Sequence, residues 1–169
     1  MRVGVLTISD RSSRGERPDA SGPGIEAFAR DRLAAEVAAS AVIPDDLATI
    51  RDTLRAWCDD RDLDLVLTTG GTGFAPRDVT PEATRAVIER EAPGLAEAMR
   101  AASLRVTPHA MLSRAVCGIR GRTLIVNLPG SPKAVLENLD TLAPALPHAV
   151  QVLRDSPAAE AGHRPAGAA

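Results

Sequence analysis

The residues best suited to chemistry lie in a glycine-rich loop that directly follows an apolar segment. Residues 63–69 are rich in β-favouring side chains and predict a buried strand, while Thr80 and Pro81 have the residue types of a helix N-cap and first helical position. Glycines between a strand and a helix allow positive φ angles and bring bare N–H groups close to a ligand. The loop therefore predicts a site for a phosphate or a compact polar head group, formed by Gly70, Gly71, Thr72 and Gly73.

Two aspartates that are distant in the sequence are expected to face the same crevice. Asp45 follows a second predicted strand, and Asp78 lies within the longer loop that the glycines open. Paired carboxylates beside a phosphate site favour Mg²⁺, which prefers a few carboxylate oxygens together with water and phosphate oxygens. Each aspartate also has a structural alternative. Asp45 could cap the helix that begins near Asp46. Asp78 could be solvated or could pair with Arg77.

The loop matches neither of the common nucleotide-binding motifs. No Gly-Lys-Ser/Thr sequence closes it as in a Walker A loop, and Pro76 stands where a dinucleotide fingerprint has its third glycine. A tight turn without a ligand is the structural alternative. Ser131 and Lys133, at a second strand-to-helix turn, could bind phosphate, or Ser131 could simply cap the helix. The residues alone predict a phosphoryl or nucleotidyl transfer site with an unspecified substrate.

The segments around these residues alternate between strands and helices, which predicts a parallel sheet covered on both faces. Ligands of such sheets bind outside the carboxyl ends of the strands. Strands are expected at residues 2–9, 37–43, 63–69, 115–119 and 122–128, and helices at residues 24–33, 47–59, 81–90, 94–104, 134–142 and from about 145 to 153.

Four segments are expected to meet at the carboxyl edge of this sheet: residues 9–10, residues 44–45, the glycine loop and residues 127–131. The polar segment at residues 10–23 is longer than a simple connection requires. It contains Asp19 and could fold over a ligand, and a solvated surface loop is the alternative.

Composition limits the partners and the compartment. The chain has 169 residues, a formal net charge of −2, two Phe, one Trp and no Tyr, which argues against nucleic acid as a partner. No apolar run is long enough for a membrane span or a signal peptide, so we predict a cytoplasmic protein without a membrane partner. Cys58 and Cys117 lack the spacing of metal ligands and are expected to be small buried hydrophobes.

The chain is expected to form one domain over residues 1–153. Residues 154–169 are predicted to be a disordered tail, because they are rich in Ala, Pro and Gly and lack an apolar period.

Six segments of the sequence resemble the molybdopterin adenylyltransferases, the bacterial MogA/MoaB group to which the G domains of gephyrin and of its plant two-domain homologue are related. The resemblance covers roughly residues 1–153, with the segments in the same order and at the right spacing. It implies a three-layer α/β/α sandwich with a mostly parallel central sheet, assembled as a homotrimer. The segments are Thr7-Ile8-Ser9-Asp10-Arg11, Pro44-Asp45-Asp46, residues 68–81, Glu91-Ala92-Pro93-Gly94-Leu95, Met111-Leu112-Ser113-Arg114 and Asn127-Leu128-Pro129-Gly130-Ser131-Pro132.

The resemblance also implies a reaction in molybdenum cofactor biosynthesis. AMP would pass from ATP to the terminal phosphate of molybdopterin with Mg²⁺, giving adenylylated molybdopterin and pyrophosphate. The eukaryotic members carry a fused metal-insertion domain that this sequence lacks, so a separate molybdenum insertase is an expected partner.

Functional residues are carried over from the family position by position. Asp45 and Asp78 match the catalytic acidic pair that would bind Mg²⁺, in agreement with the interpretation from the residues alone. Asp19 resembles a further acidic residue that matters for activity, and residues 70–73 match the nucleotide-binding loop. The residues expected to bind substrate are Ser9, Asp10, Ser113, Asn127, Pro129, Gly130 and Ser131.

Two functions of different class fit this resemblance. The intact segment at residues 77–81 favours an active adenylyltransferase. The alternative is a non-catalytic molybdopterin-binding or scaffolding module of the same fold, since a fold alone does not establish activity.

Overall fold

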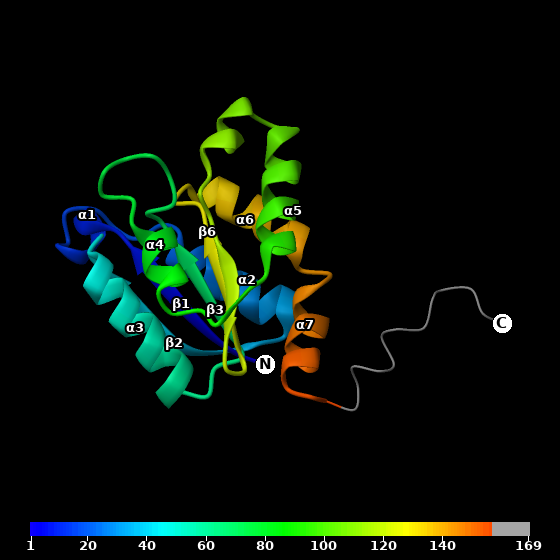
Figure 1. Cartoon of the computed structure of the whole chain (residues 1–169). Coiled ribbons are helices and arrows are strands. Elements are labelled where there is room, and N and C mark those ends of the chain that lie inside the picture. The colour runs from blue at the N-terminus through cyan, green and yellow to red at the C-terminus, as the bar shows by residue number, and fades with distance from the viewer. Residues whose placement is uncertain (157–169) are drawn as a thin grey trace.

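The computed structural model describes residues 1–156, which are organised around one six-stranded sheet (Figure 1). Its strands are β1 (Arg2–Ile8), β2 (Glu36–Ile43), β3 (Leu65–Thr69), β4 (Arg90–Glu91), β5 (Cys117–Arg120) and β6 (Thr123–Leu128). They lie side by side in the order β2, β1, β3, β6, β5, β4. In this order, β2, β1, β3 and β6 are parallel to one another. β5 pairs with β6 in the antiparallel direction, and β4 pairs with β5 in the same way. The prediction of a mostly parallel sheet is confirmed.

Helices cover both faces of the sheet, which gives the expected three layers. In Figure 1, α3 and α4 lie on one side of the sheet, and α5, α6 and α7 lie on the other. The helices are α1 (Asp10–Ser13), α2 (Gly22–Leu33), α3 (Leu47–Asp60), α4 (Thr80–Arg85), α5 (Pro93–Leu104), α6 (Pro132–Leu142) and α7 (Leu146–Leu153), with a 3₁₀ helix η1 at Pro108–Leu112.

The central strands bury side chains on both faces, which is why their sequences are almost continuously apolar. Along β1, Val3 and Val5 belong to the core under α2, α5, α6 and α7, whereas Leu6 and Ile8 belong to the core under α3 and α4. β3 and β6 alternate in the same way. The two cores fix the sheet between its helical layers, so the strand ends that carry the functional residues have defined positions.

Helix α3 shows how one of these layers is attached. Its N-cap is Asp46, whose carboxylate accepts the N–H of Thr49 at 2.8 Å. Trp57 is 5% exposed and packs toward β1, where a Cβ at Gly4 would come within 2.8 Å of the indole ring. The absence of a side chain at Gly4 therefore allows the helix to approach the sheet closely.

Two predicted segments differ from the structure. The segment predicted as one helix at residues 81–90 is the shorter α4, and it is followed by the edge strand β4. The N–H of Glu89 donates to Ile119 O and that of Ala92 to Cys117 O, both at 2.8 Å, so this segment satisfies the open edge of β5 instead of continuing as a helix. The segment predicted as a loop at residues 10–23 contains α1 and the first residues of α2.

One of the two predicted helix caps is wrong, and the other is confirmed in position but lacks the side-chain hydrogen bond. Val79 is the N-cap residue of α4, and the Thr80 hydroxyl instead donates to Gly70 O at 2.9 Å. Ser131 is the N-cap residue of α6, but its side chain makes no capping hydrogen bond. Both hydroxyls are therefore available to the loops at the carboxyl edge of the sheet rather than to their own helices.

The thiols have no reactive surroundings. Cys117 is buried, as predicted, and Cys58 is half-buried against the core. Burial raises the pKa of Cys58 to about 11 and that of Cys117 to about 12. Both thiols are thus protonated at neutral pH, as expected of small packing residues.

The end of the described chain packs onto the domain. Arg154, which we placed in the tail, ends α7, and its Nη1 atom pairs with Asp62 at 2.6 Å. Arg154 thus contacts the domain, and the domain limit at residue 153 stays a prediction. The rest of the predicted tail, residues 157–169, lies outside the described residues. Among residues 1–156, no helix is both long and apolar enough to cross a membrane.

Asn127 connects four elements in the interior. Its side chain is fully buried, its Nδ2 donates to the hydroxyls of Thr68 and Thr84 at 3.0 Å, and its Oδ1 accepts the N–H of Val116 at 3.2 Å. These bonds link β6 to β3, to α4 and to the segment that enters β5. Asn127 thus holds together the elements beneath the candidate site, whereas the sequence predicted that it contacts substrate.

We predict that Asn127→Ala lowers the free energy of unfolding by about 2–4 kcal/mol, because it leaves several buried polar groups without partners. Urea unfolding followed by circular dichroism measures this difference. Thr141→Ala is the control, since that hydroxyl bonds only to Glu137 O in its own helix. A loss of less than about 1 kcal/mol for Asn127→Ala would contradict the structural role.

Candidate active site

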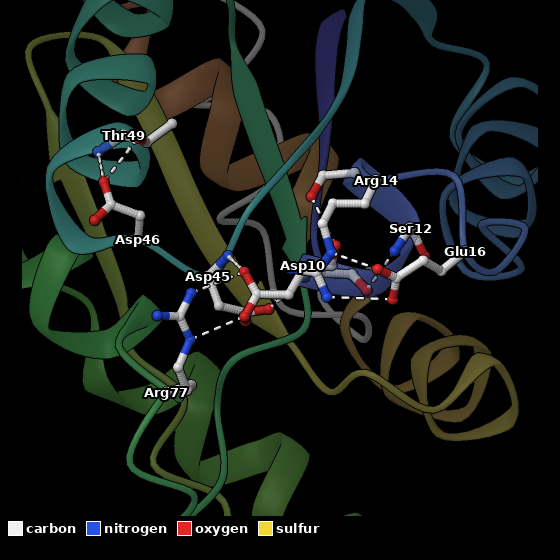
Figure 2. A network of polar contacts seen from close by, with 10 residues as sticks. Asp10, Ser12, Arg14, Glu16, Asp45, Asp46, Thr49 and Arg77 are labelled. Carbon is white, nitrogen blue, oxygen red and sulfur yellow. Dashed lines mark hydrogen bonds and ion pairs between the residues drawn. The ribbon is translucent and has the colours of Figure 1, made fainter.

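Asp10 and Asp45 hold each other at the carboxyl edge of the sheet through two reciprocal hydrogen bonds (Figure 2). The N–H of Asp10 donates to Asp45 Oδ2 at 2.7 Å, and the N–H of Asp45 donates to Asp10 Oδ1 at 3.1 Å. Because β1 and β2 are parallel neighbours that end in register at Ile8 and Ile43, these aspartates leave the sheet side by side. The predicted meeting of the two strand ends is confirmed.

Arg77 joins the glycine-loop region to this aspartate pair. Its guanidinium donates to both carboxylate oxygens of Asp10, from Nε at 2.9 Å and from Nη2 at 2.8 Å, as Figure 2 shows. This ion pair holds the pKa of the Asp10 carboxyl below its ordinary value. The alternative that Arg77 pairs with Asp78 is not observed, since its bidentate partner comes from the end of β1.

Only one carboxylate oxygen of Asp45 accepts a hydrogen bond from the described chain. Asp46, not Asp45, caps α3, so the capping alternative for Asp45 does not apply. Oδ2 accepts the N–H of Asp10, whereas Oδ1 has no hydrogen-bond partner within residues 1–156. Burial raises the pKa of Asp45, and the charges of Asp10 and Asp78 add to this shift. Asp45 is therefore a partly desolvated carboxylate that a cation would stabilise.

The glycine loop passes directly over Asp45. Gly70 and Gly71 have φ values of +99° and +63°, a region that favours glycine. A Cβ at Gly70 would collide with Ile8 O, and one at Gly71 would collide with the Thr80 hydroxyl and lie 3.2 Å from Asp45 Oδ1. The absence of a side chain at Gly70 thus lets the loop pass close to the end of β1, and Gly71 places no side chain beside the free oxygen of Asp45.

Asp78 and Arg114 fix the outer part of the loop. Asp78 accepts the N–H of Ala75 at 2.8 Å through Oδ2, and its own N–H donates to Ala75 O at 2.8 Å. Arg114 donates from Nε to Gly73 O at 2.7 Å and from Nη2 to Asp78 O. The second carboxylate oxygen of Asp78, Oδ1, has no hydrogen-bond partner in the described part of the chain.

Asp19 is bound on both oxygens by the chain itself. Its Oδ2 accepts the hydroxyl of Thr7 at 2.7 Å, and its Oδ1 accepts the N–H groups of Ser21 and Gly22 at 3.0 Å each. These contacts tie the residues before α2 to β1. In the structure, Asp19 positions the segment around it, and the catalytic role given to it remains a prediction.

Two cavities open at this edge of the sheet, and Gly71 and Gly130 line both. The first has a volume of about 430 Å³, lies between α5, η1 and the start of α6, and is largely apolar. The second has a volume of about 420 Å³, lies under residues 17–21, and is more polar. Asp78 lines the first cavity and Asp45 lines the second, so one member of the acidic pair lies on each side of the two glycines that the cavities share. These shared lining residues, Gly71 and Gly130, are called the junction of the cavities.

Most of the predicted site residues line one of these cavities. Asp10 and Asn127 do not, because Asp10 is engaged by Arg77 and Asn127 is buried beneath the site. The first cavity is lined by Gly71, Thr72, Gly73, Asp78, Ser113, Pro129, Gly130 and Ser131, and the second by Ser9, Asp19, Asp45, Gly70, Gly71 and Gly130.

The donor set of Asp45 and Asp78 fits Mg²⁺. Each carboxylate has one oxygen fixed by a backbone N–H and one oxygen without a partner in the described chain, and Gly71 places no side chain beside Asp45 Oδ1. No group of three or more His, Cys, Asp or Glu side chains gathers as a metal site within residues 1–156. A site with two carboxylates suits Mg²⁺, which completes its shell with water and substrate phosphates.

Arg114 and the partner of Arg77 were missed by the sequence analysis. Arg114 contacts loop residues that are 36 and 41 positions away in the sequence, and Arg77 contacts Asp10, which is 67 positions away. Neither pairing has a local sequence signal. The positive charge of each arginine next to a site motif is the one sequence feature that could have indicated a role in the site.

Comparison with known proteins adds to this geometry. Residues 4–148 match the family described as "Probable molybdopterin binding domain". The molybdenum cofactor synthesis protein cinnamon of Drosophila melanogaster is 47% identical over 152 residues, which cover 90% of this chain and 25% of the fly protein. The chain thus spans about a quarter of the length of that relative.

Bacterial relatives match over more of their own length. The molybdopterin adenylyltransferase of Escherichia coli K12 is 47% identical over 141 residues, which cover 83% of this chain and 72% of that protein. The crystal structure of the molybdopterin biosynthesis enzyme MoaB from Thermus thermophilus has a TM-score of 0.86 and 53% identity, covering 92% of this chain and 98% of the other. The predicted fold class is therefore confirmed.

We predict that Asp45→Asn raises the thermal unfolding temperature in EDTA at neutral pH. Because the pKa of Asp45 is raised in the folded state, its ionised form opposes folding at neutral pH. This effect should shrink as the pH falls through the raised folded-state pKa toward the ordinary value of 3.8, because the carboxyl becomes protonated in both states.

Asp46→Asn is the matched control for this measurement. The hydrogen bond with the Thr49 hydroxyl lowers the pKa of Asp46, so its ionised form favours folding and its substitution should not stabilise the protein. An unfolding temperature of Asp45→Asn below that of the wild type at neutral pH would contradict the assigned environment.

Proposed function

The chain belongs to the family of probable molybdopterin binding domains, and we propose that it is a molybdopterin adenylyltransferase. In the proposed reaction, an oxygen of the terminal phosphate of molybdopterin attacks the α-phosphorus of ATP. The bond from that phosphorus to the bridging oxygen breaks, and pyrophosphate leaves. The observation that carries the proposal is the junction of two cavities at Gly71, with one carboxylate of the acidic pair on each side.

Two cavities with one junction suit a reaction between two substrates. The largely apolar first cavity fits a flat heterocycle such as a pterin, and the more polar second cavity fits part of a nucleotide. Phosphates extending from both would meet beside the glycine loop. Holding the two reacting groups together there would supply much of the rate enhancement, since no covalent intermediate with the protein is required.

The residues at the junction have separate roles in this proposal. The backbone N–H groups of the glycine loop bind phosphate oxygens, and the Asp10–Arg77 pair keeps Asp45 in place. Asp45 and Asp78 hold Mg²⁺ through their free oxygens. When bound, Mg²⁺ neutralises phosphate charge and supports the departure of pyrophosphate.

The environment of Asp45 favours the enzyme over a pure binding module. Partial burial disfavours its ionised form, and the negative charges of Asp10 and Asp78 lie near enough to add to this effect. A module that only binds an anionic pterin would gain nothing from carboxylates beside the phosphates. A Mg²⁺-dependent transferase requires them.

The assembly, partner and compartment belong to the same proposal. The protein would act as a cytoplasmic homotrimer and pass its adenylylated product to a separate molybdenum insertase. Cinnamon supports the last point, because this chain corresponds to about a quarter of that molybdenum cofactor synthesis protein. Sedimentation velocity of the purified protein measures the oligomeric state.

We predict that Asp78→Asn lowers Mg²⁺-dependent turnover by about 10²-fold or more while the fold remains intact, since it removes one charge from a loop and no core volume. The assay measures pyrophosphate and adenylylated molybdopterin formed from ATP and molybdopterin, with EDTA as a parallel reaction. Asp46→Asn is the matched control, because asparagine still caps α3 and Asp46 lines neither cavity.

Three results would contradict parts of this proposal. Turnover of Asp78→Asn equal to that of the wild type would overturn the metal-site assignment. Wild-type product formation that persists in EDTA would overturn the role of Mg²⁺. Molybdopterin binding by the wild type without any product would identify the protein as the non-catalytic module.

A further inference from the structure

Arg100 is a half-buried cation without a counter-ion among residues 1–156. Five arginines in the described chain are half-buried, and the other four each have a carboxylate partner. Arg100 makes no ion pair within residues 1–156. Its unpaired nitrogens are not among the buried unpartnered atoms of the described chain, so they are accessible to an anionic ligand. The four paired arginines are Arg51, Arg114, Arg120 and Arg154.

The guanidinium of Arg100 is held at the wall of the first cavity. Arg100 lies on α5 and donates from Nη1 to Ala115 O at 3.1 Å, and both residues line the cavity. This bond fixes one edge of the guanidinium, while Nε and Nη2 have no hydrogen-bond partner among the described residues. Arg100 can therefore present a preformed pair of donors to a ligand in the cavity.

Neither of the two acidic residues that line this cavity, Asp78 and Glu137, forms an ion pair with Arg100. Ser103 and Asn138 bond to each other at 3.2 Å, and Asn138 Nδ2 also donates to Ala134 O at 2.8 Å. Glu137 is the other acidic lining residue besides Asp78, and it lies 3.7 Å from Lys133 Nζ in an ion pair. The cavity thus combines largely apolar walls with the unpaired guanidinium of Arg100 and the carboxylate of Asp78, and a flat ring with an anionic group would fit beside Arg100.

Building on the proposed function, we propose that Arg100 binds the dithiolene sulfurs of molybdopterin and makes the site selective for the sulfur-bearing pterin. Molybdopterin has two anionic parts, the terminal phosphate and the dithiolene. The phosphate must lie at the junction beside Asp78 and the glycine loop to react, so the dithiolene is the anionic part left for Arg100. The two thiolates match the forked, weakly hydrated guanidinium, and the neutral ring matches the apolar walls.

Equilibrium binding without ATP tests this proposal independently of turnover. Wild type, Arg100→Gln and Arg100→Lys are titrated by anaerobic calorimetry with molybdopterin and with a pyranopterin phosphate that lacks the two sulfurs. Arg100→Gln should weaken molybdopterin binding by roughly 10- to 100-fold and leave binding of the sulfur-free ligand within about twofold of the wild type. Arg100→Lys should recover part of the loss, because it keeps the charge without the fork.

Arg55→Gln is the charge-matched control, since Arg55 is exposed on α3 and lines neither cavity. Equal weakening of both ligands by Arg100→Gln would overturn the dithiolene assignment in favour of a contact with the ring or the phosphate. Unchanged affinity for both ligands would overturn the role of Arg100 in binding. If Arg100→Gln does not fold, the Arg100→Lys variant decides. A ratio of the two ligand affinities in Arg100→Lys equal to that of the wild type would contradict the need for the guanidinium.

The titrations also separate this proposal from the proposed function. A wild-type protein that binds molybdopterin but forms no adenylylated product would refute the transferase assignment. The comparison of the two ligands would still decide whether Arg100 recognises the sulfurs.

Discussion

The reciprocal hydrogen bonds between Asp10 and Asp45 are the contact on which the site depends. They exist because β1 and β2 run parallel and end at the same level, so two chain segments of unrelated sequence leave the sheet together. Arg77 then ties the loop after β3 to the same pair. The carboxylate of Asp10 thereby connects the ends of β1, β2 and β3. The carboxylate of Asp45 is held by one oxygen and has one oxygen without a partner in the described chain.

Several features of this candidate site are locally unfavourable for folding. Gly70 and Gly71 adopt positive φ angles, and Asp45 is partly buried as an acid whose ionised form the folded state disfavours. The unfavourable free energy of these features is offset by the apolar packing on both faces of the sheet and by the buried hydrogen bonds of Asn127. A site built in this way can tolerate a poorly solvated carboxylate because the strands beneath it cannot move apart.

The sequence predicted the parallel sheet, α3 and the convergence of Asp45 with the glycine loop, because each depends on local periodicity or on the rule for strand ends. It did not predict β4, since the edge of β5 decides the conformation of residues 89–92. The Thr80 cap failed because a hydroxyl suited to a cap also suits a neighbouring carbonyl, whereas Ser131 is the N-cap residue of α6 without a side-chain capping bond. Long-range pairs such as Arg114 with Gly73 have no sequence signal at all.

The distribution of charge around the two cavities follows from the same topology. The parallel strands bring acidic residues to the junction, whereas the first cavity lies between α5, η1 and α6, where the sheet contributes few polar groups. The wall of that cavity away from the sheet is formed by side chains of α5, η1 and α6, which do not belong to the strand ends. In its proposed role, a single arginine on α5 sets the selectivity of the cavity, while the strand ends hold Asp45 in place.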